Sequence, residues 1–321
     1  MSGNGQDVNR PGNQPLVMSP LADPVVNAIF SSEKVAGLAA ESLIRVILEA
    51  EGENRKVGKV VKVTPQRAHT APGQRGSRID IEILTDSNEI AIVEVQISSD
   101  EAIMQRNLFA ASHIYTKTSS SGTTPPEMAE QLPTVIAINI LNYPIREDNN
   151  EILQPFKILY TKPPLKEAIP QFSGYNVQLS RIPDITADFN SGFYCWFYTL
   201  YKADHEGKTV KEIVDMTPEL QIYSDRDTGY QQFCTQYDLA AGDPETRDEY
   251  VLWVKDRMRE YGMKKASENE GIAKGRAEAD AQWQGVVAEK DVELEAKDTE
   301  LKAKDAIIAE LKARLDESKD K

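Results

Sequence analysis

The stretch that decides the fold is RIDIEILTDSNEIAIVEVQ, residues 78–96. It contains two runs rich in β-branched residues, 79–84 and 90–96, separated by a short polar segment. Two such runs with a short polar connection are typical of an antiparallel hairpin. We predict a register in which Leu84 pairs with Ile90, because side chains alternate between the two faces of each strand.

This register gives the hairpin one apolar face and one acidic face. The apolar face is predicted to contain Ile79, Ile81, Ile83, Ala91, Val93 and Val95. On the other face Asp80 lies opposite Glu94, and Gln96 points the same way as Glu94 because the two are two positions apart on one strand.

Opposed carboxylates about 5 Å apart destabilise a strand pair unless something positive lies between them. Carboxylate oxygens suit Mg²⁺ or Mn²⁺, with water and substrate phosphate completing the coordination. We therefore predict that Asp80 and Glu94 hold a divalent metal. The alternative is a solvated sheet face with two unrelated acids.

The segments around the hairpin predict an α/β fold with a mixed β-sheet flanked by helices. Residues 23–50 have a helical pattern with a break near Ser31, and residues 133–141 have the continuous apolar character of a buried strand. The other predicted elements are strands at 57–63, 156–161 and 176–182, helices at 100–117, 187–202 and 244–262, and loops at 64–77 and 119–126.

A third acid, Glu41, lies in the predicted helix on the stripe formed by Leu38, Ile44 and Leu48. An acid is unexpected on an apolar stripe. Glu41 therefore either sits at the edge of that stripe and reaches solvent, or points toward the metal site as a third ligand. Helical spacing leaves both interpretations open.

The two ends of the chain differ from its middle. Residues 1–20, rich in Gly, Asn and Pro, predict a disordered lead; residues 21–262 form the main domain; residues 263–321 form a charged helical tail. The tail repeats KDVELEA, KDTELKA and KDAIIAE, which places Leu294, Leu301, Ile308 and Leu315 on one helical stripe. The second position that a coiled coil needs is charged, so self-association into a homo-oligomer and a solvated single helix both remain open.

The net charge of −14 over 321 residues argues against a simple nucleic-acid binder. The tail from Lys264 onward has 12 basic and 15 acidic residues, so it contributes −3 and the rest of the chain contributes −11. However, residues 55–78 contain no acid. Arg67, Arg75 and Arg78 fall there, and we predict that they contact DNA backbone phosphates; a solvated loop is the alternative.

The remaining features of the composition predict where in the cell the chain is found. It is 40% hydrophobic without an apolar run of about 20 residues, and its polar start lacks the pattern of a signal peptide. The two cysteines, Cys195 and Cys234, have no metal-ligand spacing. We predict a soluble cytoplasmic protein with no membrane partner.

Four segments together resemble a known family. They are the pair RIDI and VEVQ, the helix QRNLFAASHIY, the strand LPTVIAINIL and the tail fragment EGIAKGRAEAD. They are similar to the PD-(D/E)xK nuclease superfamily, and within it to the recombination-promoting nuclease and transposase group. The helix matches at Arg106, Leu108, Ser112 and Tyr115, and it departs from the group's pattern at Phe109 and Ala110, where Tyr is expected. The resemblance covers residues 21–160 and the tail fragment.

The resemblance implies a restriction-endonuclease-like core with metal ligands at Asp80 and Glu94. Gln96 stands where most members have Lys, and its neutral amide can orient a water or a phosphate oxygen. Arg106 could supply the missing positive charge, although a lone helical Arg is more often a surface residue. The implied catalytic set is Asp80, Glu94, Gln96 and Arg106.

The implied function is Mg²⁺- or Mn²⁺-dependent DNA endonuclease activity linked to recombination or mobile elements. The ion would lower the pKa of an attacking water and stabilise charge on the phosphate oxygens. A catalytically weak nuclease fold that serves as an interaction or assembly module is the alternative. A nuclease for RNA is a third reading, because nothing in the predicted site reads a base or a 2′-hydroxyl.

Overall fold

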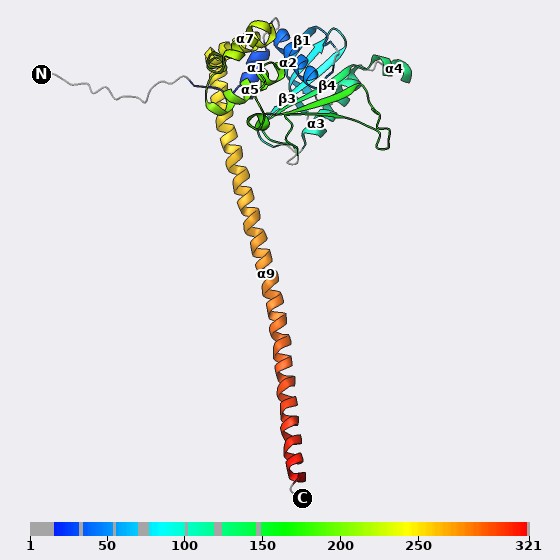
Figure 1. Cartoon of the computed structure of the whole chain (residues 1–321), viewed down its shortest axis with the longest axis vertical. Helices are drawn as coiled ribbons and strands as arrows, with labels where there is room; N and C mark the ends of the chain where they lie inside the picture. The colour runs from blue at the N-terminus through cyan, green and yellow to red at the C-terminus, as the bar shows by residue number, and fades with distance from the viewer. Residues whose placement is uncertain are drawn as a thin grey trace, which may run out of the picture. The chain divides into compact units, whose positions relative to one another are not determined.

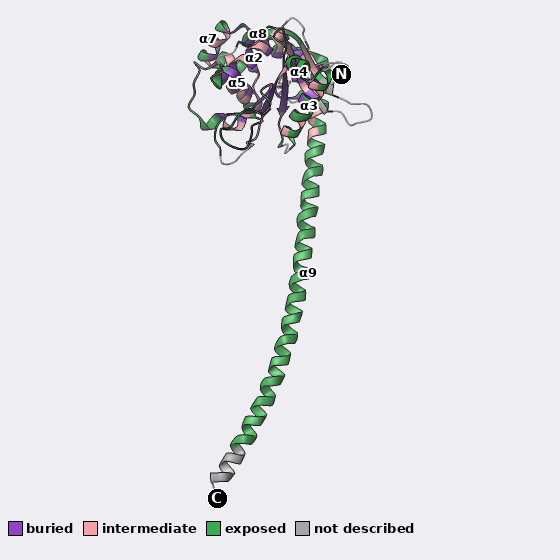
Figure 2. Ribbon diagram, turned by 90° about the vertical axis from the view of Figure 1, so that its right-hand side faces the viewer, coloured by how far each residue is buried: buried purple, intermediate pink, exposed green. Residues whose placement is uncertain are grey.

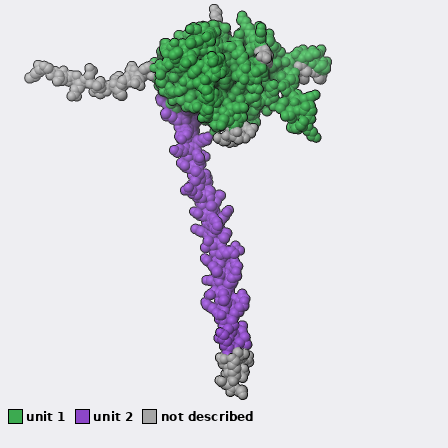
Figure 3. Space-filling model, in the orientation of Figure 1, with its two compact units in different colours: residues 1–254 green, residues 255–321 purple. Residues whose placement is uncertain are grey.

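The structure is a computed structural model of the chain. It describes residues 16–31, 35–53, 56–69, 77–99, 102–118, 124–145 and 149–319. Within these ranges, the side chains of residues 67–69, 77–78, 125, 128–129 and 313–319 are not described. The chain divides into two compact units, Met1–Val254 and Lys255–Lys321 (Figure 3).

The first unit is built on a six-stranded sheet with the order β1-β2-β3-β4-β6-β5. Its strands are β1 Val60–His69, β2 Ser77–Thr85, β3 Glu89–Gln96, β4 Thr134–Leu141, β5 Leu153–Lys157 and β6 Phe172–Gln178. β1, β2 and β3 are antiparallel, β3, β4 and β6 are parallel, and β5 runs antiparallel to β6. The predicted mixed sheet is confirmed.

Helices cover both faces of this sheet (Figure 1). The larger core cluster packs α1 Asp23–Phe30, α2 Ala36–Ala50, α5 Gly192–Glu206 and α8 Thr228–Gly242 against one face. The smaller cluster packs α3 Ile103–Thr118 against the other. The remaining helices of this unit are α4 Pro125–Gln131, η1 Leu179–Asp184, α6 Val210–Met216 and α7 Pro218–Arg226. The predicted α/β class with flanking helices is therefore confirmed.

The β2–β3 hairpin has the predicted register from Leu84 with Ile90 to Ile81 with Val93, and its pairing ends there, one residue before Asp80 and Glu94. One residue of the predicted apolar face is misplaced. Ile79 packs in the cluster beneath α3 and not in the cluster that contains Ile81. The neighbouring strand β1 is irregular at this point, because Gln66, which lies between the partners of Ile81 and Ile79, has a φ of 49°. Such an irregularity turns the strand locally and re-aims the side chains that precede it.

Several element boundaries differ from the prediction. β1 continues to His69 through residues that were predicted to be a loop, because it pairs with β2 as far as Ser77. Strand pairing of this kind overrides a loop-like local composition. β5 and β6 each begin three or four residues before the predicted strands, and α6, α7 and α8 were not predicted.

The described chain begins inside the predicted N-terminal lead. Residues 1–15 lie outside the described part, but Met18 is fully buried and its carbonyl accepts a hydrogen bond of 2.5 Å from the Tyr237 hydroxyl. The fold therefore includes residues that the composition of the lead assigned to disorder.

A single helix, α9 Pro244–Lys319, extends from the first unit through the second. In the first unit Tyr250 and Trp253 pack against the core. From residue 258 onward every described side chain of this helix is exposed (Figure 2), including Leu294 and Leu301, while Leu315 has no described side chain. Ion pairs three or four residues apart, such as that between Lys297 and Glu293, support this helix. Among the described residues, no helix combines the length and the apolar character needed to cross a bilayer.

Candidate functional site

Glu94 is a carboxylate buried in the middle of the sheet. It lies on β3 between two other strands and is 2% exposed. Burying an ionised carboxylate costs several kcal/mol unless it is paired. Its Oε2 atom accepts a hydrogen bond of 2.5 Å from Arg106 Nη2, on α3, and a longer one of 3.5 Å from Gln96 Nε2.

Asp80 lies on the neighbouring strand, β2. Its Oδ2 atom accepts a hydrogen bond of 2.7 Å from the backbone N–H of Val95, the residue after Glu94. Burial raises the pKa of Asp80 to about 6, the Val95 bond and the charge of Arg106 oppose the rise, and the charge of Asp23 adds to it. The ionised form of Asp80 is therefore poorly compensated near neutral pH, which is the condition that a bound cation relieves.

One guanidinium connects the two acids. Arg106 forms the ion pair with Glu94 and also lowers the pKa of Asp80 by its charge. Its side chain is 31% exposed, so it can also face solvent or a ligand. The structure thus joins Glu94 to Gln96 and Arg106 by hydrogen bonds, and it links Asp80 to this group through the Val95 N–H bond and the charge of Arg106.

Asp23 is a residue that the sequence analysis missed. It is exposed in the first turn of α1 and acts on Asp80 through its charge. Its local sequence signal is ambiguous, because an acid followed by Pro is also the ordinary start of a helix. The electrostatic interaction that links it to Asp80 joins residues 57 positions apart in the chain.

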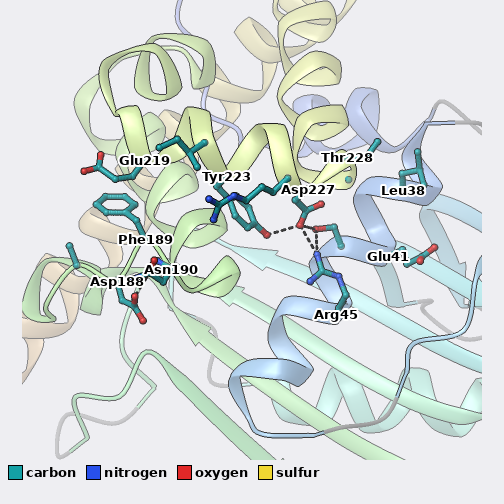
Figure 4. Close-up of a pocket in the computed structure, with 15 residues that line it drawn as sticks. Leu38, Glu41, Arg45, Asp188, Phe189, Asn190, Glu219, Tyr223, Asp227 and Thr228 are labelled. Atoms are coloured by element: carbon teal, nitrogen blue, oxygen red, sulfur yellow. Dashed lines mark hydrogen bonds and ion pairs between the residues drawn. The ribbon is translucent and has the colours of Figure 1, made fainter.

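Glu41 lies elsewhere. It lines a pocket of about 840 Å³ with residues of α2, α7 and α8, among them Arg45, Tyr223 and Asp227 (Figure 4). Neither Asp80 nor Glu94 lines this pocket. The structure does not bring Glu41 to the acid pair, and its half-buried position agrees with the alternative of an acid at the edge of the helix stripe.

The pocket contains a closed hydrogen-bond network around Asp227 (Figure 4). Its Oδ2 atom accepts bonds from Ser42 Oγ at 2.7 Å, Arg45 Nη2 at 2.5 Å and Tyr223 Oη at 2.6 Å, and its Oδ1 atom accepts one from Tyr230 N at 3.0 Å. These bonds join α2, α7 and α8 and satisfy the carboxylate. The network therefore stabilises the helical layer.

The predicted phosphate-binding arginines are only partly described. Arg67 and Arg78 have their backbones in β1 and β2, in strands and not in the predicted loop, and their side chains are not described. Arg75 lies outside the described residues. Their role in binding phosphates stays a prediction.

The donor set suits a hard divalent cation. Among the described side chains, no group of three or more His, Cys, Asp or Glu residues gathers as a metal-binding cluster. Mg²⁺ in proteins is commonly held by one or two carboxylates, with water and phosphate oxygens as the other ligands. Asp80 and Glu94 supply two carboxylates, and the raised pKa of Asp80 shows that one of them lacks compensation.

An acid on one strand of a hairpin and Glu-x-Gln on the next, in a mixed sheet between helical layers, define a nuclease fold of the PD-(D/E)xK type. The chain belongs to the PD-(D/E)XK nuclease family transposases, whose family profile matches residues 20–264. The chain matches no curated protein and no solved structure.

Proposed function

We propose that this chain is a divalent-metal-dependent DNA endonuclease that acts in recombination or in the movement of mobile elements. Membership of a family of nuclease-type transposases supports the nuclease chemistry and the link to mobile elements. The observation that carries the proposal is the action of Arg106 on both carboxylates, because it indicates that Asp80 and Glu94 belong to one electrostatic site.

Each residue has a separate task in this proposal. Asp80 and Glu94 hold Mg²⁺ or Mn²⁺, which supplies Lewis-acid stabilisation of charge on the phosphodiester. Gln96 donates its amide hydrogens to orient a water or a phosphate oxygen. Arg106 is shared between Glu94 and the substrate phosphate, and Asp23 adds negative charge beside Asp80.

Substrate binding is proposed to rest on phosphate contacts by Arg67, Arg75 and Arg78. Such contacts are independent of base sequence and weaken as salt concentration rises. They also explain how a chain with a net charge of −14 can bind DNA, because a local basic segment can attract DNA to one region of an acidic protein.

The test is nicking of supercoiled plasmid with Mg²⁺ or Mn²⁺. We expect Glu94→Gln to reduce nicking by at least about 100-fold, since it removes a charged group from the reacting site. Glu41→Gln is the matched control, because it removes the same charge from a residue that lines a different pocket. The proposal fails if Glu94→Gln cuts like the natural protein, or if the natural protein cuts with neither metal.

A second candidate function, assembly through α9, is supported by the exposure of that helix. Leu294, Leu301 and Ile308 are 64%, 59% and 48% exposed at intervals of seven residues. If they pair with a second copy, a chain ending at Gly262 will sediment with a lower oligomeric state than the full chain. Replacing Leu294 and Leu301 by Ser should have the same effect, and an unchanged sedimentation coefficient of this full-length variant would exclude assembly through these residues.

A further inference from the structure

A line of buried polar side chains crosses the sheet beside Glu94. Glu94 pairs with Asn139 on β4, Asn139 with Asn176 on β6, and Asn176 with Gln154 on β5. Their exposed fractions are 2%, 0%, 5% and 9%. Burying a polar side chain costs free energy compared with burying an apolar side chain of the same shape. A row of four buried polar side chains is therefore expected to have a specific structural or functional role.

This row faces α3. Glu94 and Asn139 each follow by two residues a member of the apolar cluster beneath α3, Ile92 and Ala137, and residues two apart share a face of a strand. The helix residues above that cluster include Ala110 and Ala111, whose short side chains give little to fix the helix lengthwise on the sheet. Polar contacts add to the fixing of the helix that Ile114 and Tyr115 provide in this cluster.

Two consecutive residues of α3 reach two adjacent strands at this row. Arg106 Nη2 donates to Glu94 on β3, and Asn107 Nδ2 donates to Asn139 Oδ1 on β4 at 3.0 Å. Asn139 Nδ2 in turn donates to Asn176 Oδ1 at 2.7 Å. Because an amide has one donor end and one acceptor end, the bond to Asn176 leaves the Asn139 oxygen directed to Asn107.

We infer that Asn107 and Asn139 are positioning residues, whose hydrogen bond fixes α3 so that Arg106 lies on Glu94. Asn176 acts one step further away by orienting the Asn139 amide. The consequence for nucleic-acid cleavage rests on the proposed function. The consequence for the Arg106–Glu94 pair is a property of the fold alone.

The experiment measures the coupling between Arg106 and Glu94 by a double-mutant cycle in the full chain. Arg106→Met, Glu94→Gln and their combination are unfolded with urea, first in the natural background and then with Asn107→Leu and Asn139→Leu together. Replacing both amides avoids leaving one polar partner behind in this contact. Because each cycle is closed within its own background, a general loss of stability cancels.

We expect a coupling of roughly tenfold or more in the unfolding equilibrium constant for the natural background, and less than about threefold without the amide pair. Gln154→Leu is the matched control, because it changes a buried amide of the same row on the edge strand and should leave the coupling intact. Equal coupling in the natural and amide-free backgrounds overturns the inference, as does an equal loss in the Gln154→Leu background.

A milder variant keeps the test decisive if the double replacement does not fold. Asn107→Ala leaves the bond between Asn139 and Asn176 in place and removes only the contact with α3. It should lower the coupling several-fold, and retention of the full coupling overturns the inference. A protein that lacks nuclease activity but loses the coupling in these variants would disprove the proposed function while supporting the positioning role.

Discussion

Asp80→Asn is expected to stabilise the metal-free protein at pH 7.5 by up to about 3 kcal/mol. Burial raises the pKa of Asp80 from the usual 3.8 to about 6, and each pKa unit corresponds to about 1.4 kcal/mol. Asparagine retains an oxygen that can accept the Val95 N–H bond, so the substitution removes the buried charge and keeps the contact. The measurement is the free energy of unfolding in urea, with metal removed by a chelator.

The pH dependence of this effect has a defined sign. Because the folded-state pKa is raised, the protonated carboxyl favours the fold below about pH 4, and that contribution is lost as pH rises through about 6. The advantage of Asp80→Asn should therefore vanish near pH 4 and be complete above pH 7. Added Mg²⁺ should stabilise the natural protein and not the variant, since binding to the folded state alone adds stability.

Asp86→Asn is the control for this prediction, because Asp86 is exposed in the hairpin turn and its replacement should change stability little at either pH. A variant Asp80→Asn that is less stable than the natural protein at pH 7.5 would contradict the assigned burial. The result distinguishes two roles for Asp80. If Asp80 is a cation ligand, its replacement stabilises the metal-free protein, whereas the replacement of a purely structural acid lowers stability.

Arg106→Met is expected to destabilise the protein by about 3 kcal/mol. The substitution keeps much of the side-chain volume but removes the cation paired with Glu94, and breaking a buried pair from one side leaves an uncompensated charge. Urea unfolding at pH 7.5 measures the loss. The double variant Arg106→Met with Glu94→Gln should recover most of the lost stability, because no buried charge then remains at this pair.

Lys211→Met provides the matched comparison for an exposed pair. Lys211 and Asp215 are 63% and 55% exposed at their side chains, so their pair should contribute far less to stability than a buried pair. If Arg106→Met costs no more than Lys211→Met, the pairing of Arg106 with Glu94 does not compensate a buried charge. Arg106 would then have no reason to be assigned to the site.

The sequence predicted those parts of the site that depend on local pattern. Alternation of polar and apolar residues fixed the register of Leu84 on Ile90, and this register placed Asp80 and Glu94 on neighbouring strands. It misplaced Ile79, which packs beneath α3 next to the unusual backbone of Gln66 in β1, a feature that alternation within the hairpin does not encode. It also left Glu41 with two possible positions, since helical spacing gives a direction around the helix axis but not the element that the helix faces.

By itself, the sequence determined the class of the fold, the two strands that carry Asp80 and Glu94, and the long charged helix, because each of these follows from periodicity within one or two adjacent segments. Tertiary structure alone decided that Asp23 acts on Asp80, that Arg106 pairs with Glu94, and that an amide row holds α3. These contacts join elements that are separate in the chain. They depend on how helices pack on the sheet, which short-range pattern does not encode.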